Sequence, residues 1–312
     1  MRAPATGRRR LTPRALGAVF AGAVAGWWND NVPRMGASLA YYTLFALAPI
    51  LVVAIAIGGL VFGAEAVRGE IVGQIQGLIG RQGGEAIQAM LEGAARPRTS
   101  VLATVAGVLT FFLGATGAFL ELQTALDAIW RVKPKEDTSF VRALVRQRLI
   151  SFGLVVALGF LLLTSLLVSA ALAAIHNYLG NAFPGVVVLW EALNVVVSLG
   201  VITLLFALIY KVLPDVRLRW SEVWVGALVT AGLFSIGKLV IGLYLGTASV
   251  ASTYGAAGSV VVILVWVYYS SQVILLGAEF TRAYVDQFGR RPAPEQFAVR
   301  DRTGKTGKKG ST

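Results

Sequence analysis

The sequence predicts an all-α polytopic membrane protein with six transmembrane helices. Of its 312 residues, 56% are hydrophobic and only 14% are charged, and the mean hydropathy of +0.70 is far above that of a soluble domain. The apolar residues form continuous blocks long enough to cross a hydrocarbon core of about 30 Å. These blocks lack the alternation of a barrel strand. The predicted spans are about 37–62, 101–126, 149–175, 186–210, 221–246 and 256–281.

The first predicted element lies ahead of these spans, at residues 13–28. Thr12 followed by Pro13 is a favourable N-cap and first helical residue, and Trp27 and Trp28 suit the headgroup level of a membrane. We expect an interfacial helix that forms an elbow into the first span and packs on the bundle through its Ala and Gly face. The alternative is a signal peptide, because three arginines at 8–10 precede the apolar stretch.

Between the first and second spans, residues 65–95 predict short amphipathic helices in an external loop. Val67, Ile71, Ile75 and Leu78 recur at helical spacing before RQGG at 81–84, and apolar residues recur again after it. These helices are expected either to rest on the end of the bundle or to cap an external cavity.

The distribution of basic residues predicts the orientation of the spans. Of 28 Lys and Arg residues, 23 precede the first span, follow the second or fourth span, or follow the sixth. Basic loops stay in the cytoplasm, so both termini are predicted to be cytoplasmic. The net charge of +12 is therefore a topology signal, and no nucleic-acid partner is expected. Residues 1–285 form the predicted membrane domain, and the charged tail 286–312 is expected to be disordered.

Polar side chains within the spans are the candidate functional residues. Gln272 and Glu279 are seven residues apart, which places them within about 20° of each other on one helix face. A charge near the bilayer centre costs roughly 2.5 to 3.5 kcal/mol, so these groups are expected to face protein or admitted water. Pro49 is expected to bend the first span. The full candidate set is Tyr41, Tyr42, Glu121, Glu191, Asn194, Lys238, Tyr268, Tyr269, Gln272 and Glu279.

Several enzyme classes find no support in the residues. The chain has no Cys and a single His, His176, so Cys-bound and His-cluster metal sites are not expected. No GxxxxGK[ST] phosphate loop occurs. No cofactor, metal ligand or catalytic residue is predicted.

Several separated motifs resemble the YihY/BrkB family of bacterial inner-membrane proteins. They are ASLAYYTLFALAPILVVAI at 37–55, DAIWRVKP at 127–134, KVLPDVRLRW at 211–220 and STYGAAGSVVVILVWVYYSSQVILLGAEF at 252–280. The resemblance implies six helices in the inner membrane. Members carry the labels ribonuclease BN, virulence or serum-resistance factor, and candidate lipid transporter. Ribonuclease activity is not expected, because His176 falls at the predicted outer end of the third span and no cytoplasmic loop has clustered carboxylates.

These observations predict a transporter or translocase of a lipid-like or amphiphilic substrate, with membrane lipids as partners. The candidate residues would line a polar cavity walled by all spans except the third. In it, Lys238 would turn inward to attract an anionic headgroup, with Glu191 as its counter-charge, and Glu121 or Glu279 would carry a proton. The alternative is a non-transporting envelope scaffold, in which the polar groups only hold helices together. The residues indicate neither the substrate nor the oligomeric state.

Overall fold

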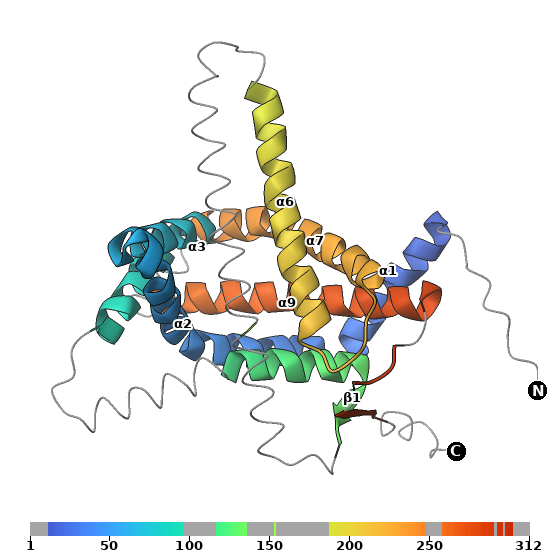
Figure 1. The fold of residues 1–312 in the computed structure, drawn as a ribbon. Helices are drawn as coiled ribbons and strands as arrows, with labels where there is room; N and C mark the ends of the chain where they lie inside the picture. The colour runs from blue at the N-terminus through green and yellow to red at the C-terminus, as the bar shows by residue number, and fades with distance from the viewer. Residues whose placement is uncertain are drawn as a thin grey trace, which may run out of the picture.

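The computed structural model describes residues 12–95, 117–135, 153, 187–247, 258–289, 292–295 and 297–301. Helix α9 (Gly258–Phe288) runs through the middle of this structure (Figure 1). The helices with the most extensive contacts to it are α1 (Pro13–Asn29), α2 (Val32–Phe62), α3 (Ala64–Ala95) and α7 (Trp220–Thr247). Helix α6 (Val187–Val212) packs on α7, and its first half stands clear of the other labelled elements in Figure 1.

Three helices of the described part are long and apolar enough to cross a membrane. Their candidate spans are Val195–Val212, Trp220–Ile241 and Val260–Phe288, which correspond to the predicted fourth, fifth and sixth spans. The first predicted span lies within α2, which has 31 residues. Most of the second span and nearly all of the third lie outside the described residues, so the total of six stays a prediction.

Helix α1 begins as its sequence predicts. The Thr12 side chain accepts a hydrogen bond from the backbone N–H of Ala15 at 3.3 Å, and Pro13 is the first helical residue. Val19 and Ala23 are buried in a cluster with Phe280 of α9, so the small-residue face packs on the bundle. Its location at the membrane interface stays a prediction.

Helix α3 is assigned as helical from Ala64 to Ala95, yet it folds back on itself. Arg68 and Glu92 form an ion pair with 3.4 Å between Nη2 and Oε1, whereas a straight helix would place residues 24 apart about 36 Å from each other. A Cβ on Gly84 would meet the Gln76 side chain, so the reversal lies between these residues. Residues on the two sides of RQGG therefore lie in two arms, as expected, within one continuous helical assignment. The external location of these arms stays a prediction.

The C-terminal segment differs from the expected disordered tail. Strand β2 (Ala298–Arg300) pairs antiparallel with β1 (Val132–Pro134), with Lys133 opposite Val299. Before it, Ala293 accepts a backbone hydrogen bond from Arg217 at 2.9 Å, and Glu295 donates one to Asp215 at 3.0 Å. Composition missed this order because the segment is held by backbone pairing and by the burial of one small residue, Ala298, in the main hydrophobic core. Residues 302–312 lie outside the described part.

The largest hydrophobic core lies where α9, α6, α7, α2 and helical residues 117–130 meet. Its fully buried members include Leu126, Ile129, Leu213, Val223 and Leu275. The members of this core come from both halves of the sequence. Their packing therefore holds the ends of these helices in fixed positions relative to one another.

Candidate functional site

The polar stripe of α9 faces the turn that joins α1 to α2. The side-chain oxygen of Gln272 accepts a hydrogen bond from the indole N–H of Trp27 at 3.0 Å. A Cβ on Gly36 would meet the Gln272 amide nitrogen, and one on Gly26 would meet the Glu279 carboxylate. The two polar groups therefore share a face, as their seven-residue spacing predicts, and two glycines make room for them.

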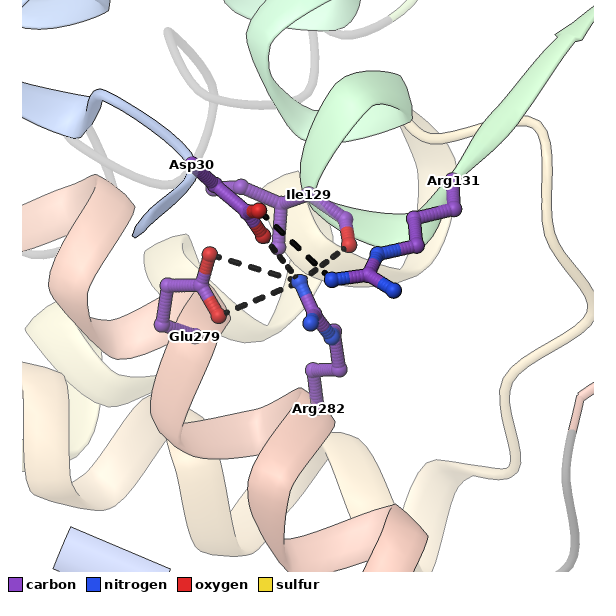
Figure 2. Close-up of polar contacts among 5 residues, drawn as sticks. All are labelled: Asp30, Ile129, Arg131, Glu279 and Arg282. Carbon is purple, nitrogen blue, oxygen red and sulfur yellow. Dashed lines mark hydrogen bonds and ion pairs between the residues drawn. The ribbon is translucent and has the colours of Figure 1, made fainter. Parts of the chain in front are cut away.

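Glu279 belongs to an ion cluster (Figure 2) in which Glu279 is buried and Arg131 is half-exposed. Its carboxylate is 3.3 Å from Arg282 Nη1, and the same nitrogen is 2.5 Å from Asp30 Oδ2. Arg282 also donates to the backbone carbonyl of Ile129 at 2.8 Å. Arg131 completes the cluster, with 3.6 Å between its Nη2 and Asp30 Oδ1. Two acidic and two basic groups neutralise one another where Glu279 is only 2% exposed.

The backbone is unusual where the chain turns at this cluster. Asn31 and Arg131, with φ of 55° and 54°, are the non-glycine residues of the described part that have positive φ. Non-glycine residues in the left-handed region cost on the order of 1 to 3 kcal/mol and need surrounding contacts to hold them. The Arg131 guanidinium contacts Asp30, while the Arg131 carbonyl accepts a hydrogen bond from the Asp301 N–H at 2.9 Å. The cluster thus joins the α1–α2 turn, the end of helical residues 117–130, α9 and the C-terminal segment.

A second polar group, absent from the predicted set, connects α6, α7 and α9. Tyr210 is 1% exposed, with its hydroxyl 3.0 Å from Thr230 Oγ1, and it donates to the Ile274 carbonyl at 2.7 Å. Gly277 leaves room for both hydroxyls, because a Cβ there would meet each of them. The sequence feature that could have indicated this contact is Gly277, a glycine within the long apolar helix α9.

An apolar cavity of about 340 Å³ lies between α2, α3, α9 and helical residues 117–130. Among its lining residues, Thr43, Ser270 and Ser271 carry hydroxyls. The Ser271 hydroxyl donates to the Val267 carbonyl at 2.7 Å, whereas the buried Ser270 hydroxyl has no hydrogen-bond partner within the described residues. The rest of the lining is apolar: Leu39, Leu47, Ile50, Ile75, Ile87, Ala118, Phe119, Leu122, Ile263, Trp266, Val267 and Ile274.

The tyrosines of the predicted set lie outside the lining of this cavity. Tyr41 and Tyr42 are exposed on α2 and pack edge to face against each other. Tyr268 is also exposed, and the Tyr269 hydroxyl approaches the Leu233 carbonyl of α7 at 3.5 Å. This cavity is therefore apolar, and the expected polar cavity stays a prediction.

The remaining predicted residues are not brought together in the described part. Lys238 lies on the exposed face of α7 beside exposed Leu239, so the expected inward orientation is not observed there. Glu121 is half-buried. The side chains of Glu191 and Asn194 lie outside what the structure describes. Helix α2 continues through Pro49, and a bend at that residue stays a prediction.

Within the described residues, no group of three or more His, Cys, Asp or Glu residues is placed to hold a metal ion. The clustered charges are two acids and two arginines that satisfy one another, an arrangement suited to joining helices rather than to binding a free cation.

Comparison with known proteins places this arrangement among bacterial membrane proteins. The family model described as "Virulence factor BrkB" matches residues 23–300. The UPF0761 membrane protein of Ralstonia nicotianae is 30% identical over 256 residues, covering 80% of this chain and 55% of that protein. A UPF0761 membrane protein of Verminephrobacter eiseniae is 31% identical, with 81% and 58% covered. The chain thus spans little more than half the length of these curated relatives. No solved structure matches it.

Proposed function

Since the chain belongs to the BrkB family of membrane proteins, we propose that it moves a lipid-like or amphiphilic molecule across the bacterial inner membrane. Both termini would be cytoplasmic, because the basic loops and tail lie on one side of the predicted topology. The ion cluster would then lie at the cytoplasmic end of the bundle. Membrane lipids would be the partners, with no nucleic acid involved.

The apolar cavity carries this proposal. Ligand sites are usually concave and mostly apolar with a few polar groups, over about 300 to 1,000 Å³, and the 340 Å³ cavity falls in this range. Its walls come from α2 and α9, which overlap the first and sixth predicted spans. An amphiphile has an apolar body to place in such a cavity and a polar group to leave near its hydroxyls.

Transbilayer movement of a fluorescent phospholipid tests the proposal. The protein is reconstituted into liposomes, and dithionite reports how fast labelled lipid from the inner leaflet becomes accessible. We expect faster exposure than in protein-free liposomes, and slower exposure with Ala118→Leu, which fills the cavity. Ala192→Leu, which makes the same substitution at an exposed position of α6, is the matched control. A rate equal to that of protein-free liposomes for folded protein contradicts the proposal.

A non-transporting scaffold is the second candidate, and one observation favours it. Two polar side chains of α9 contact protein partners: the Gln272 oxygen accepts from Trp27, and the Glu279 carboxylate pairs with Arg282. Under this alternative, cluster substitutions change stability alone and Ala118→Leu leaves the envelope phenotype unchanged. The proposal, in contrast, requires the cavity substitution to change lipid movement in folded protein.

A further inference from the structure

We propose that the exposed side shared by α2 and helical residues 117–130 binds the headgroup of a zwitterionic phospholipid, with Arg34 on its phosphate and Glu121 on its ammonium group. This inference rests on the proposed function and names the headgroup of the lipid. Neither residue lines the apolar cavity, and binding is tested separately from transport.

Two contacts set the register of helical residues 117–130 against α2. At one end, Arg131 pairs with Asp30, with 3.6 Å between Nη2 and Oδ1. At the other end, a Cβ on Gly117 would lie 3.3 Å from the Tyr42 ring. Residue numbers fall along one helix as they rise along the other, so the two helices are antiparallel.

This register brings the two charged residues to similar heights. Glu121 follows Gly117 by four residues, about 6 Å along the helix, and Arg34 precedes Tyr42 by eight, about 12 Å. Arg34 and Glu121 are therefore offset by about 6 Å, roughly one helical turn. Of the two, Glu121 lies farther from the α1–α2 turn.

An exposed stripe runs along α2 from Arg34. The spacing of Arg34, Ser38, Tyr41 and Phe45 places them within about 60° of one another on the helix. Arg34 is exposed, Tyr41 is 56% exposed and Phe45 59%, and the two rings pack edge to face at 5.0 Å between centroids. The stripe thus presents a cation near the α1–α2 turn and aromatic rings beyond it.

Glu121 lies on the matching side of its own helix. Gly117, Glu121 and Thr124 are also within about 60° of one another, with Thr124 exposed and Glu121 half-buried, whereas Leu122 faces the core. Because Gly117 is where Tyr42 makes contact, this side adjoins the stripe of α2.

The protein leaves both charges unsatisfied. Within the described residues, the structure shows no hydrogen bond or ion pair for the side chain of Arg34 or of Glu121. Glu121 falls within the predicted second span, and an ionisable group inside a membrane is unfavourable unless it is paired. Two opposite charges without partners therefore flank one side of a helix pair.

A headgroup with one anion and one cation on a short linker complements these charges. A guanidinium binds phosphate through two parallel hydrogen bonds, and a primary ammonium donates up to three hydrogen bonds, for which a carboxylate is an acceptor. The ammonium would lie deeper along the helices than the phosphate, and Tyr41 and Phe45 would contact the acyl chains.

Native mass spectrometry tests the site, because it resolves each bound lipid by mass. The full chain in maltoside detergent is titrated with phosphatidylethanolamine, or with phosphatidylglycerol of the same acyl chains, which has the phosphate without the ammonium. We expect tighter binding of phosphatidylethanolamine. Arg34→Gln should weaken binding of both lipids about tenfold or more, and Glu121→Gln should weaken that of phosphatidylethanolamine alone.

Arg81→Gln and Glu85→Gln are the matched controls, because they make the same two changes in an exposed ion pair of α3. Neither should alter the binding of either lipid. The unfolding midpoint of every variant is measured in the same detergent, so that affinities are compared between folded proteins.

Equal affinity of the unaltered chain for the two lipids overturns the ammonium site, as does a Glu121→Gln loss that is the same for both. An Arg34→Gln variant that binds as Arg81→Gln does overturns the phosphate site. Selective binding without lipid movement leaves the headgroup site intact and removes the transport function. Lipid movement without selective binding does the reverse, so the two proposals fail separately.

Discussion

Arg282 offers the sharpest test of the ion cluster. It contacts Asp30, Glu279 and the Ile129 carbonyl, and its side chain is 18% exposed. Replacement by Met keeps the apolar stem and removes the cation, which leaves Glu279 buried without its partner. Removing one member of a buried ion pair costs about 3 to 5 kcal/mol, and we expect Arg282→Met to fall in this range.

Glu279→Gln should cost less, about 1 to 3 kcal/mol, because Arg282 retains Asp30. The double variant should be more stable than the sum of the single losses predicts, since neither change then leaves Glu279 charged and unpaired. A coupling of about 0.5 to 3 kcal/mol is expected for residues in contact. The coupling energy should make the double variant more stable than the sum of the two single losses predicts. Two independent sites would instead give additive losses and no coupling energy.

The assay is denaturant-induced unfolding of the protein in detergent, followed by tryptophan fluorescence. Arg81→Met is the matched control, because Arg81 and Glu85 form an ion pair at 3.5 Å with side chains 84% and 60% exposed. Exposed pairs contribute at most about 1 kcal/mol. The reasoning is refuted if Arg282→Met is no more harmful than Arg81→Met, or if the losses simply add.

Three further outcomes are expected. Gly26→Ala should destabilise the protein because its Cβ would meet the Glu279 carboxylate, whereas Gly17→Ala, with nothing within 4 Å, should be neutral or slightly stabilising; equal unfolding midpoints would contradict this. Reporter fusions after residue 95, His176 or Thr247 should be external, and fusions after 133, 217 or 300 cytoplasmic; a cytoplasmic signal at 176 would contradict six spans. Purified protein should not cleave tRNA precursors above a mock preparation, and turnover lost on a single carboxylate substitution would show otherwise.

The sequence predicted local features well because they depend on spacing and nearby residues. The Thr12 cap and the shared face of Gln272 and Glu279 both follow from helix geometry over a few turns. The identity of the partners did not follow. Trp27 and Gln272 are 245 residues apart, and a polar stripe has the same pattern whether it lines a cavity or bonds to another helix.

Of the predicted polar residues, Gln272 and Glu279 lie on one face of α9, whereas none of the predicted set lines the apolar cavity. Cavity-lining Ile and Leu side chains look like any membrane helix, so only packing distinguishes them. Lys238 was expected inside because its depth made lipid exposure unfavourable, yet the structure places it on the exposed face of α7. Tyr210 was missed because one hydroxyl in an apolar helix gives no periodic signal.

The ion cluster also sets an order on biogenesis. Asp30 and Arg282 are 252 residues apart, and synthesis proceeds from the N-terminus, so Asp30 and Arg131 emerge from the ribosome long before their central partner. The cluster closes only when α9 is in place, and the Asp301 contact with Arg131 follows nineteen residues later. A chain that ends before α9 keeps the Asp30–Arg131 pair, whose arginine is half-exposed, and lacks the contact of Arg282 that ties the α1–α2 turn to α9.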